Sequence, residues 1–168
     1  MLDLTPGLEV GARFALIRRL GRGGAAEVWL ADDRERGESV ALKVLDPADP
    51  PDPGLARRLA DEAARANRLP REHTVGHYGV VEAGGLLLVA MEYMPGGDLG
   101  QFRGRSFESW AAAAQDVAAA LAACHAAGLV HRDVKCGNVL LDAGGRARLA
   151  DFGIALAAGS SAGGGSPY

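Results

Sequence analysis

Three strand-like segments with short connections constrain the fold of this chain more than any other feature. Residues 13–20 (RFALIRRL), 27–31 (EVWLA) and 39–45 (SVALKVL) have the composition of β-strands. A glycine-rich connection separates the first two segments, and a polar turn, DDRERGE, separates the second from the third. Neither connection has room for a crossover helix. The sequence therefore predicts an antiparallel meander and argues against a Rossmann-type βαβ unit.

Two later segments have the periodicity of amphipathic helices. Residues 55–69 and 107–127 carry apolar side chains at the spacing of one helix face. Ser106 or Ser109 can cap the second helix, and Gly128 can end it. The side chains predicted to face the core are Leu55, Leu59, Ala63, Ala66 and Leu69 in the first helix, and Trp110, Ala114, Val117, Leu121 and Cys124 in the second.

Glycine and proline clusters divide the rest of the chain. Pro95-Gly96-Gly97 interrupts the strand pattern and is the best candidate for a boundary between two lobes. We therefore predict an α+β fold of two units, residues 1–94 and residues 95–168. Further strands are predicted at 74–82, 86–93, 139–141 and 146–150.

Composition excludes several kinds of partner. The 168 residues include 18 basic and 21 acidic side chains, for a formal net charge of −3. This is not the basic surplus of a domain that binds nucleic acid or an anionic membrane. No apolar run approaches the length of a spanning helix and the start of the chain lacks a signal-peptide pattern, so we expect no membrane segment and a cytoplasmic location. Cys124 and Cys136 form neither a disulfide framework nor a zinc pattern, and Cys124 is expected in the core.

A glycine loop and a lysine in the predicted meander can carry chemistry. In GRGGAAEV, residues 21–28, backbone N–H groups can approach phosphate oxygens closely, although such loops often only turn a hairpin. Lys43 lies within an apolar strand, where its charge needs a partner. Glu62 on the first predicted helix can supply one. The alternative is that Lys43 extends to an exposed edge of the sheet.

Polar residues also gather around the last two predicted strands. The segment HRDVKCGNVLL, residues 131–141, precedes one strand, and Asp151 follows the other. Asp133 can orient a hydroxyl group or accept its proton, and the Asn138 carbonyl and the Asp151 carboxylate are suitable ligands for Mg²⁺. Taken singly, either aspartate can equally be a helix cap or a turn residue.

The order and spacing of these motifs are more informative than any one of them. They resemble the signature set of protein kinases, and the glycine loop is similar to that of the eukaryotic-like serine/threonine protein kinases found in bacteria. The resemblance covers roughly residues 13–168. The residues that carry it are Lys43, Glu62, His131-Arg132-Asp133, Asn138 and Asp151-Phe152-Gly153.

The resemblance implies a two-lobe kinase fold and transfer of the γ-phosphate of ATP, with Mg²⁺, to serine or threonine hydroxyls of proteins. Asp133 would position the acceptor hydroxyl and accept its proton, and Lys135 would neutralise charge on the γ-phosphate. Asn138 and Asp151 would hold Mg²⁺. These polar groups are then expected to face metal and phosphate rather than one another.

The resemblance also implies a nucleotide site. Lys43, fixed by an ion pair with Glu62, would hold the α- and β-phosphates. Met91 would be the gatekeeper, and residues 92–94 would form the hinge that hydrogen-bonds the adenine. The remaining nucleotide-binding positions are Leu20, Gly21, Gly23 and Gly24 at the glycine loop, Glu92 and Met94 in the hinge, and Val28, Ala41 and Leu140, which would enclose the adenine.

The implied partners are protein substrates with serine or threonine acceptors, with autophosphorylation at Ser160 or Ser161 and a homodimer as further candidates. Ser166-Pro167-Tyr168 resembles the segment that receives the acceptor, and Arg132 resembles an arginine that pairs with an activation-loop phosphate. In the family an Ala-Pro-Glu motif and more helices follow, so the second lobe is expected to be incomplete. Two alternatives stay open: a nucleotide-binding regulatory module without transfer activity, and a small-molecule phosphotransferase.

Overall fold

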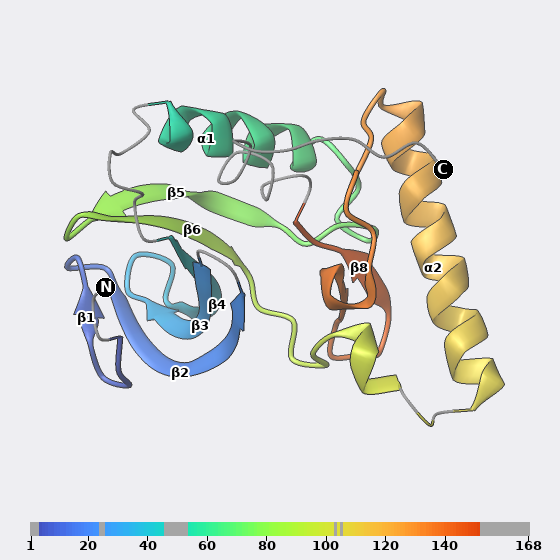
Figure 1. The fold of residues 1–168 in the computed structure, drawn as a ribbon, viewed down its shortest axis with the longest axis horizontal. Helices are drawn as coiled ribbons and strands as arrows, with labels where there is room; N and C mark the ends of the chain where they lie inside the picture. Colours follow the sequence, from blue (N-terminus) through green and yellow to red (C-terminus); the bar gives the residue numbers. More distant parts are fainter. Residues whose placement is uncertain (1–3, 24–25, 46–53, 103, 105, 152–168) are drawn as a thin grey trace, which may run out of the picture.

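The predicted meander forms the larger sheet of the structure. The computed structural model describes residues 4–23, 26–45, 54–102, 104 and 106–151. Within this part, six strands form an antiparallel sheet in the order β1-β2-β3-β4-β6-β5, which is strongly curled (Figure 1). The strands are β1 (Glu9–Val10), β2 (Phe14–Gly23), β3 (Ala26–Asp33), β4 (Glu38–Leu45), β5 (His77–Ala83) and β6 (Leu86–Glu92).

The curl of the sheet has a local cause in β2. The register of β2 against β3 shifts between Leu16 and Arg18 and again between Arg19 and Gly21, and such bulges bend a strand and increase its twist. The turn after β1 consequently reaches the end of β5, where a Cβ atom at Gly11 would lie 3.1 Å from that of Ala83. The concave side encloses an apolar core that includes Phe14, Leu16, Trp29, Val40, Leu42 and Leu88.

Helix α1 (Leu55–Ala66) packs against β5 (Figure 1). Leu59, Ala63 and Ala66 are buried as predicted, and Leu69 is buried just beyond the helix. The helix ends at residue 66 rather than at 69, and Asn67 is its C-cap residue. Its side-chain amide donates to the His77 carbonyl (2.7 Å), and its Oδ1 accepts from the His77 N–H (3.0 Å). These two bonds fix the end of α1 to the start of β5.

The second predicted helix is α2 (Phe107–Ala126), which packs against β8. Ser106 caps it by accepting from the Ser109 N–H. At the other end Gly128, with φ of +71°, forms a Schellman motif in which the Leu129 N–H donates to the Cys124 carbonyl. Cys124 is fully buried, as expected. No helix among the described residues is long and apolar enough to cross a membrane.

One predicted core position of α2 is wrong. Ala114 is exposed, and Ala113 and Ala120 are buried instead. Alanine occupies both faces of this helix, so hydrophobic periodicity defines its buried face poorly. The other elements of this region are two 3₁₀ turns, η1 (Leu99–Phe102) and η2 (Cys136–Asn138), and the two-stranded sheet of β7 (Val139–Leu141) and β8 (Ala147–Leu149).

Backbone hydrogen bonds join β8 to the segment before β5. The Val75 N–H donates to the Leu149 carbonyl, and the Leu149 N–H donates to the His73 carbonyl, both at 2.9 Å. This pairing explains why the strand predicted at 74–82 begins at His77: residues 73–75 pair with β8, not with β6. The strand β8 is thereby fixed both to β7 and to the segment before β5. The boundary at Pro95-Gly96-Gly97 stays a prediction.

His77 is an unusual buried group at this junction. The residue is 3% exposed, and among the described residues neither of its ring nitrogens has a hydrogen-bond partner. Burial lowers the pKa of His77 below its ordinary value, although the negative charge of Asp151 opposes the shift. The folded chain therefore holds this imidazole neutral, whereas the unfolded chain can protonate it.

The free energy of unfolding should consequently fall as the pH decreases through about 6.5, the unfolded pKa of histidine, because the unfolded chain then binds the proton more tightly. Urea unfolding at about pH 7.5 and about pH 5.5 measures this loss. The loss should be smaller in His77→Leu and unchanged in His125→Leu, which alters an exposed histidine of α2. Equal losses in the His77→Leu chain and the unmutated chain would contradict the assignment.

Candidate active site

Five of the expected adenine-site residues lie in one apolar cluster between the two sheets. Ala41, Met91 and Met94 are buried members of this cluster, and Val28 and Leu140 pack against it. They come from β4, β6, the segment after β6, β3 and β7. Chain segments far apart in sequence therefore form one apolar wall of the kind that binds a planar ring.

The glycine loop is the tip of the hairpin formed by β2 and β3. Gly21 pairs with Val28, and Gly23 pairs with Ala26, while Gly24 lies outside the described residues. Leu20 is 37% exposed and is not part of the apolar cluster. The hairpin alternative noted for this glycine sequence is thus compatible with the structure, and a phosphate contact stays a prediction.

Lys43 is paired with Asp151. Its ammonium nitrogen Nζ lies 2.9 Å from Asp151 Oδ2, and the Lys43 side chain is only 12% exposed. The expected ion pair between Lys43 and Glu62 is not present among the described residues, so this prediction is wrong for this structure. A largely buried ammonium needs a contacting carboxylate, and here Asp151 provides it.

Glu62 lies nearby without an ion pair within the described part of the chain. It is half-buried on α1, and burial is the largest cause that raises the pKa of its carboxyl group. The positive charges of Arg65, Lys43 and Arg132 oppose that shift, whereas Asp151 adds to it. Glu62 is therefore close enough to sense Lys43 and Asp151, and it contacts neither.

Asp151 has a strained backbone and an unused oxygen. Its φ is +56°, a left-handed conformation that aspartate adopts more readily than most residues. Oδ2 accepts from Lys43, but Oδ1 is buried and has no hydrogen-bond partner among the described residues. Phe152 and Gly153 lie outside the described residues.

The loop before β7 is tied to the segment that carries Asp151. His131 is 1% exposed, its Nε2 lies 2.9 Å from the Ala150 carbonyl, and its Nδ1 accepts from the Asp133 N–H at 3.4 Å. Because Nδ1 accepts a hydrogen bond, the ring proton is on Nε2, which donates a hydrogen bond to the Ala150 carbonyl. The Ala150 N–H in turn donates to the Asn138 carbonyl at 2.9 Å. The positions of Asp133 and Asp151 are thus fixed relative to one backbone segment.

Asp133, Lys135 and Asn138 contact one another. Lys135 Nζ lies 2.7 Å and Asn138 Nδ2 2.9 Å from Asp133 Oδ2. In this structure these groups therefore contact one another, and their expected contacts with metal and phosphate stay a prediction. The reason is proximity, because opposite charges two residues apart on a loop are within side-chain reach. The hydrogen bond from Lys135 is the largest cause that lowers the pKa of Asp133, so its carboxylate is charged and can accept a hydrogen bond from a hydroxyl.

The donor set fits a magnesium ion held together with phosphate. Asn138 uses its amide nitrogen on Asp133, and no hydrogen bond within the described part of the chain engages its Oδ1. Asp151 Oδ1 is the second unused oxygen. Mg²⁺ is usually bound by one or two protein oxygens together with water and phosphate oxygens. No group of three or more His, Cys, Asp or Glu side chains suited to a metal ion occurs among the described residues.

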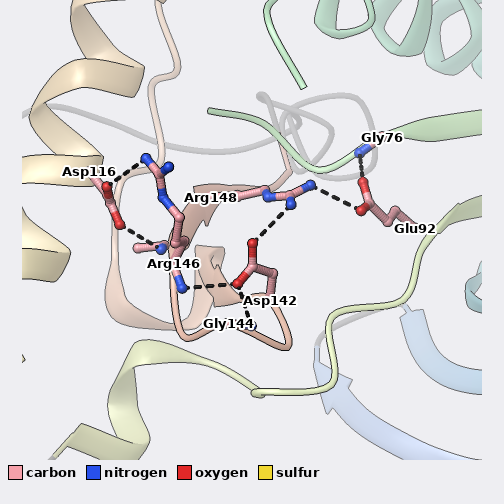
Figure 2. A network of polar contacts seen from close by, with 8 residues as sticks. Gly76, Glu92, Asp116, Asp142, Gly144, Arg146 and Arg148 are labelled. Atoms are coloured by element: carbon pink, nitrogen blue, oxygen red, sulfur yellow. Dashed lines mark hydrogen bonds and ion pairs between the residues drawn. The ribbon is translucent and has the colours of Figure 1, made fainter. Parts of the chain in front are cut away.

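The sequence predictions missed a polar network around Arg148 (Figure 2). Arg148 donates to Glu92 Oε1 (3.0 Å) and to Asp142 Oδ2 (2.9 Å), and Glu92 Oε2 accepts from the Gly76 N–H (3.2 Å). The only sequence signal is an arginine between Ala147 and Leu149, two buried positions of a short strand. That pattern ordinarily predicts a partly exposed arginine and nothing more.

The chain is similar in sequence to known protein kinases. The family model described as protein kinase domain matches residues 14–163. Serine/threonine-protein kinase PknD of Mycobacterium tuberculosis is 38% identical over 165 residues, which are 94% of this chain and 24% of that protein. PknA of Corynebacterium glutamicum is 37% identical over 158 residues, or 89% of this chain and 34% of that protein.

Solved structures show the same fold. A crystal structure of a mutant PknI kinase domain of Mycobacterium tuberculosis matches with a TM-score of 0.72 and 35% sequence identity, covering 91% of this chain and 64% of that one. The chain thus spans about a quarter to a third of the two curated relatives and about two thirds of this kinase domain. With a family match over most of its length and a kinase-like α+β fold, the chain belongs to the protein kinase family.

Proposed function

We propose that the chain carries the nucleotide site and the phosphotransfer residues of a protein serine/threonine kinase. The reaction is transfer of the γ-phosphate of ATP to serine or threonine hydroxyls of protein substrates. The observation that carries the proposal is the convergence of Lys43, Asp151, Asp133 and Asn138 beside one apolar cluster, although they come from distant parts of the sequence. Residues 1–94 and 95–168 are the two lobes in this proposal.

Each protein group has a role that its surroundings support. The apolar side chains of Ala41, Leu140 and Met91 hold the adenine. Lys43 contacts the α- and β-phosphates, because a largely buried ammonium favours an anionic partner. Asn138 and Asp151 would hold Mg²⁺, which neutralises charge on the phosphate oxygens when it is bound.

Asp133 and Lys135 act at the acceptor end. The lowered pKa of Asp133 makes it a weak base, so its main contribution is to orient the acceptor hydroxyl by accepting its hydrogen bond. Lys135 already lies on that carboxylate and can shift its ammonium to the γ-phosphate. Phosphoryl transfer depends mainly on positioning and charge stabilisation, and these residues need no unusual reactivity.

The remaining parts of the proposal concern partners and place. Ser160 and Ser161, the autophosphorylation candidates, lie outside the described residues, as does Ser166-Pro167-Tyr168. The use of ATP is the ground for proposing a cytoplasmic location. A homodimer stays a prediction.

A second candidate function is a nucleotide-binding regulatory module that transfers no phosphate. The observation that favours it is the ion pair of Lys43 with Asp151, which occupies the lysine that Glu62 is expected to fix. If that pairing persists with nucleotide bound, the phosphates lose an organised cation. Binding and transfer must therefore be measured separately.

Calorimetry with Mg²⁺ and ATP should show binding to the 168-residue chain, and Lys43→Met should weaken it by about tenfold or more, because a charge-assisted contact is lost. Arg34→Met is the control, since Arg34 is an exposed cation paired with Glu9, away from the site. Equal affinity of the Lys43→Met and unmutated chains would contradict the nucleotide assignment.

Transfer of labelled γ-phosphate to peptides that contain serine or threonine should fall by about a hundredfold or more in Asp133→Asn, while the affinity for Mg²⁺ and ATP changes little. Asp32→Asn is the matched control, because Asp32 is exposed and its side chain bonds only the Ser39 hydroxyl among the described residues. Nucleotide binding without transfer by the unmutated chain would favour the regulatory module. Transfer to a small-molecule hydroxyl alone would favour the small-molecule phosphotransferase.

A further inference from the structure

Few side-chain ion pairs join the sheet of β1–β6 to the later part of the chain. Among the described residues they are Lys43 with Asp151 and Arg148 with Glu92. The proposed function engages Lys43 and Asp151 with phosphate and metal, so that contact changes when nucleotide binds. Arg148 and Glu92 lie outside the proposed phosphate contacts, and their ion pair can persist throughout turnover.

Arg148 bridges two carboxylates that belong to different parts of the fold (Figure 2). One terminal nitrogen, Nη1, lies 3.0 Å from Glu92 at the end of β6, and the other, Nη2, lies 2.9 Å from Asp142 after β7. Asp142 is itself immobilised, because its Oδ1 accepts from the N–H groups of Gly144 and Arg146. Arg148 therefore connects a rigid turn to the proposed hinge.

Glu92 is also bonded to the segment before β5. Its Oε2 accepts from the Gly76 N–H at 3.2 Å, and its own N–H donates to the Gly76 carbonyl at 2.8 Å. On the other side, Arg148 is the register partner of Leu140 across β7 and β8. The ion pair thus links the start of the proposed hinge to the strand that presents Leu140 to the apolar cluster.

Stability alone explains this arrangement poorly. The Arg148 side chain is 19% exposed, and its Nε is buried without a hydrogen-bond partner among the described residues. A mostly buried ion pair with an unsatisfied N–H contributes little net stability compared with an apolar side chain of similar size. The planar guanidinium does, however, fix two carboxylates at a set separation, which a lysine ammonium does not.

We infer that Arg148 is a positioning residue for the nucleotide: it fixes residues 92–94 relative to Leu140, and so sets the width of the adenine site. The inference rests on the proposed function. Arg148 would not contact the nucleotide itself and would act through Glu92 and the β7–β8 pair. Substitution of Arg148 should therefore weaken binding of the adenosine part of the ligand and leave the phosphate contacts unchanged.

The test is calorimetric titration of the 168-residue chain with Mg²⁺ and ATP, and separately with adenosine. Arg148→Met should raise both dissociation constants by a similar factor of about ten, because small displacements of binding groups reduce affinity strongly. Arg148→Lys, which keeps the charge but reaches one carboxylate at a time, should give a smaller rise. Arg146→Met is the matched control, since Arg146 lies on the same hairpin and pairs with Asp116 of α2.

A double-mutant cycle with Glu92→Gln tests whether Arg148 acts on the nucleotide through Glu92 or through a general loss of packing. If the two residues act as one unit, the doubly substituted chain should bind adenosine about as weakly as the Arg148→Met chain. Thermal unfolding without ligand establishes that each variant is folded. If Arg148→Met does not fold, the rise in the dissociation constants of Arg148→Lys is the test.

The outcomes distinguish this inference from the proposed function. If the unmutated chain binds neither ligand, both are wrong. If it binds both and Arg148→Met binds them equally well, the inference is wrong and the proposed function stands. A loss confined to ATP, or an equal loss in Arg146→Met, would also overturn the inference.

Discussion

The ion pair between Lys43 and Asp151 is the contact on which the arrangement of the site depends. An ammonium group inside an apolar strand is unfavourable unless a carboxylate lies beside it, and Asp151 Oδ2 lies 2.9 Å away. For Asp151 to reach β4, the backbone after β8 must be held close to the sheet. Leu149 donates to His73 and accepts from Val75, and these bonds hold the backbone there. Ala150 donates to the Asn138 carbonyl and accepts from His131 Nε2, which holds the next residue as well.

The same bonds explain why the loop with Asp133 lies where it does. His131 is buried against Ala150, so the loop and Asp151 share one support. The apolar cluster that includes Ala41 and Met91 continues across this junction and incorporates Ala150. The binding surface, the paired charges and the loop are therefore parts of one packed unit, and a local change at Ala150 would disturb all three.

The sequence was sufficient for much of the fold because the decisive signals are local. Short connections require the meander, a Ser cap and a glycine in the left-handed conformation delimit α2, and periodicity places Leu59 and Ala63 in the core. The alanine-rich face of α2 shows the limit of that approach. Ala114 and Ala113 are chemically the same, and only tertiary packing decides which one is buried.

The polar contacts were less predictable, because several partners compete for each charge. Motif order indicates that Lys43, Glu62 and Asp151 belong to one site, but it does not determine which carboxylate the lysine contacts. Likewise, Lys135 contacts Asp133 because the two residues are close along the chain. No sequence motif marks Arg148. Its role depends on Glu92 and Asp142, and only folding brings these two carboxylates to Arg148.

The most direct test of the central claim is a crystal structure of the chain with Mg²⁺ and a non-hydrolysable ATP analogue. We predict the adenine between Ala41 and Leu140, the Lys43 ammonium on the α- and β-phosphates, and Asp151 Oδ1 on the metal. A nucleotide bound away from Ala41 and Leu140, with Lys43 still paired to Asp151, would contradict it.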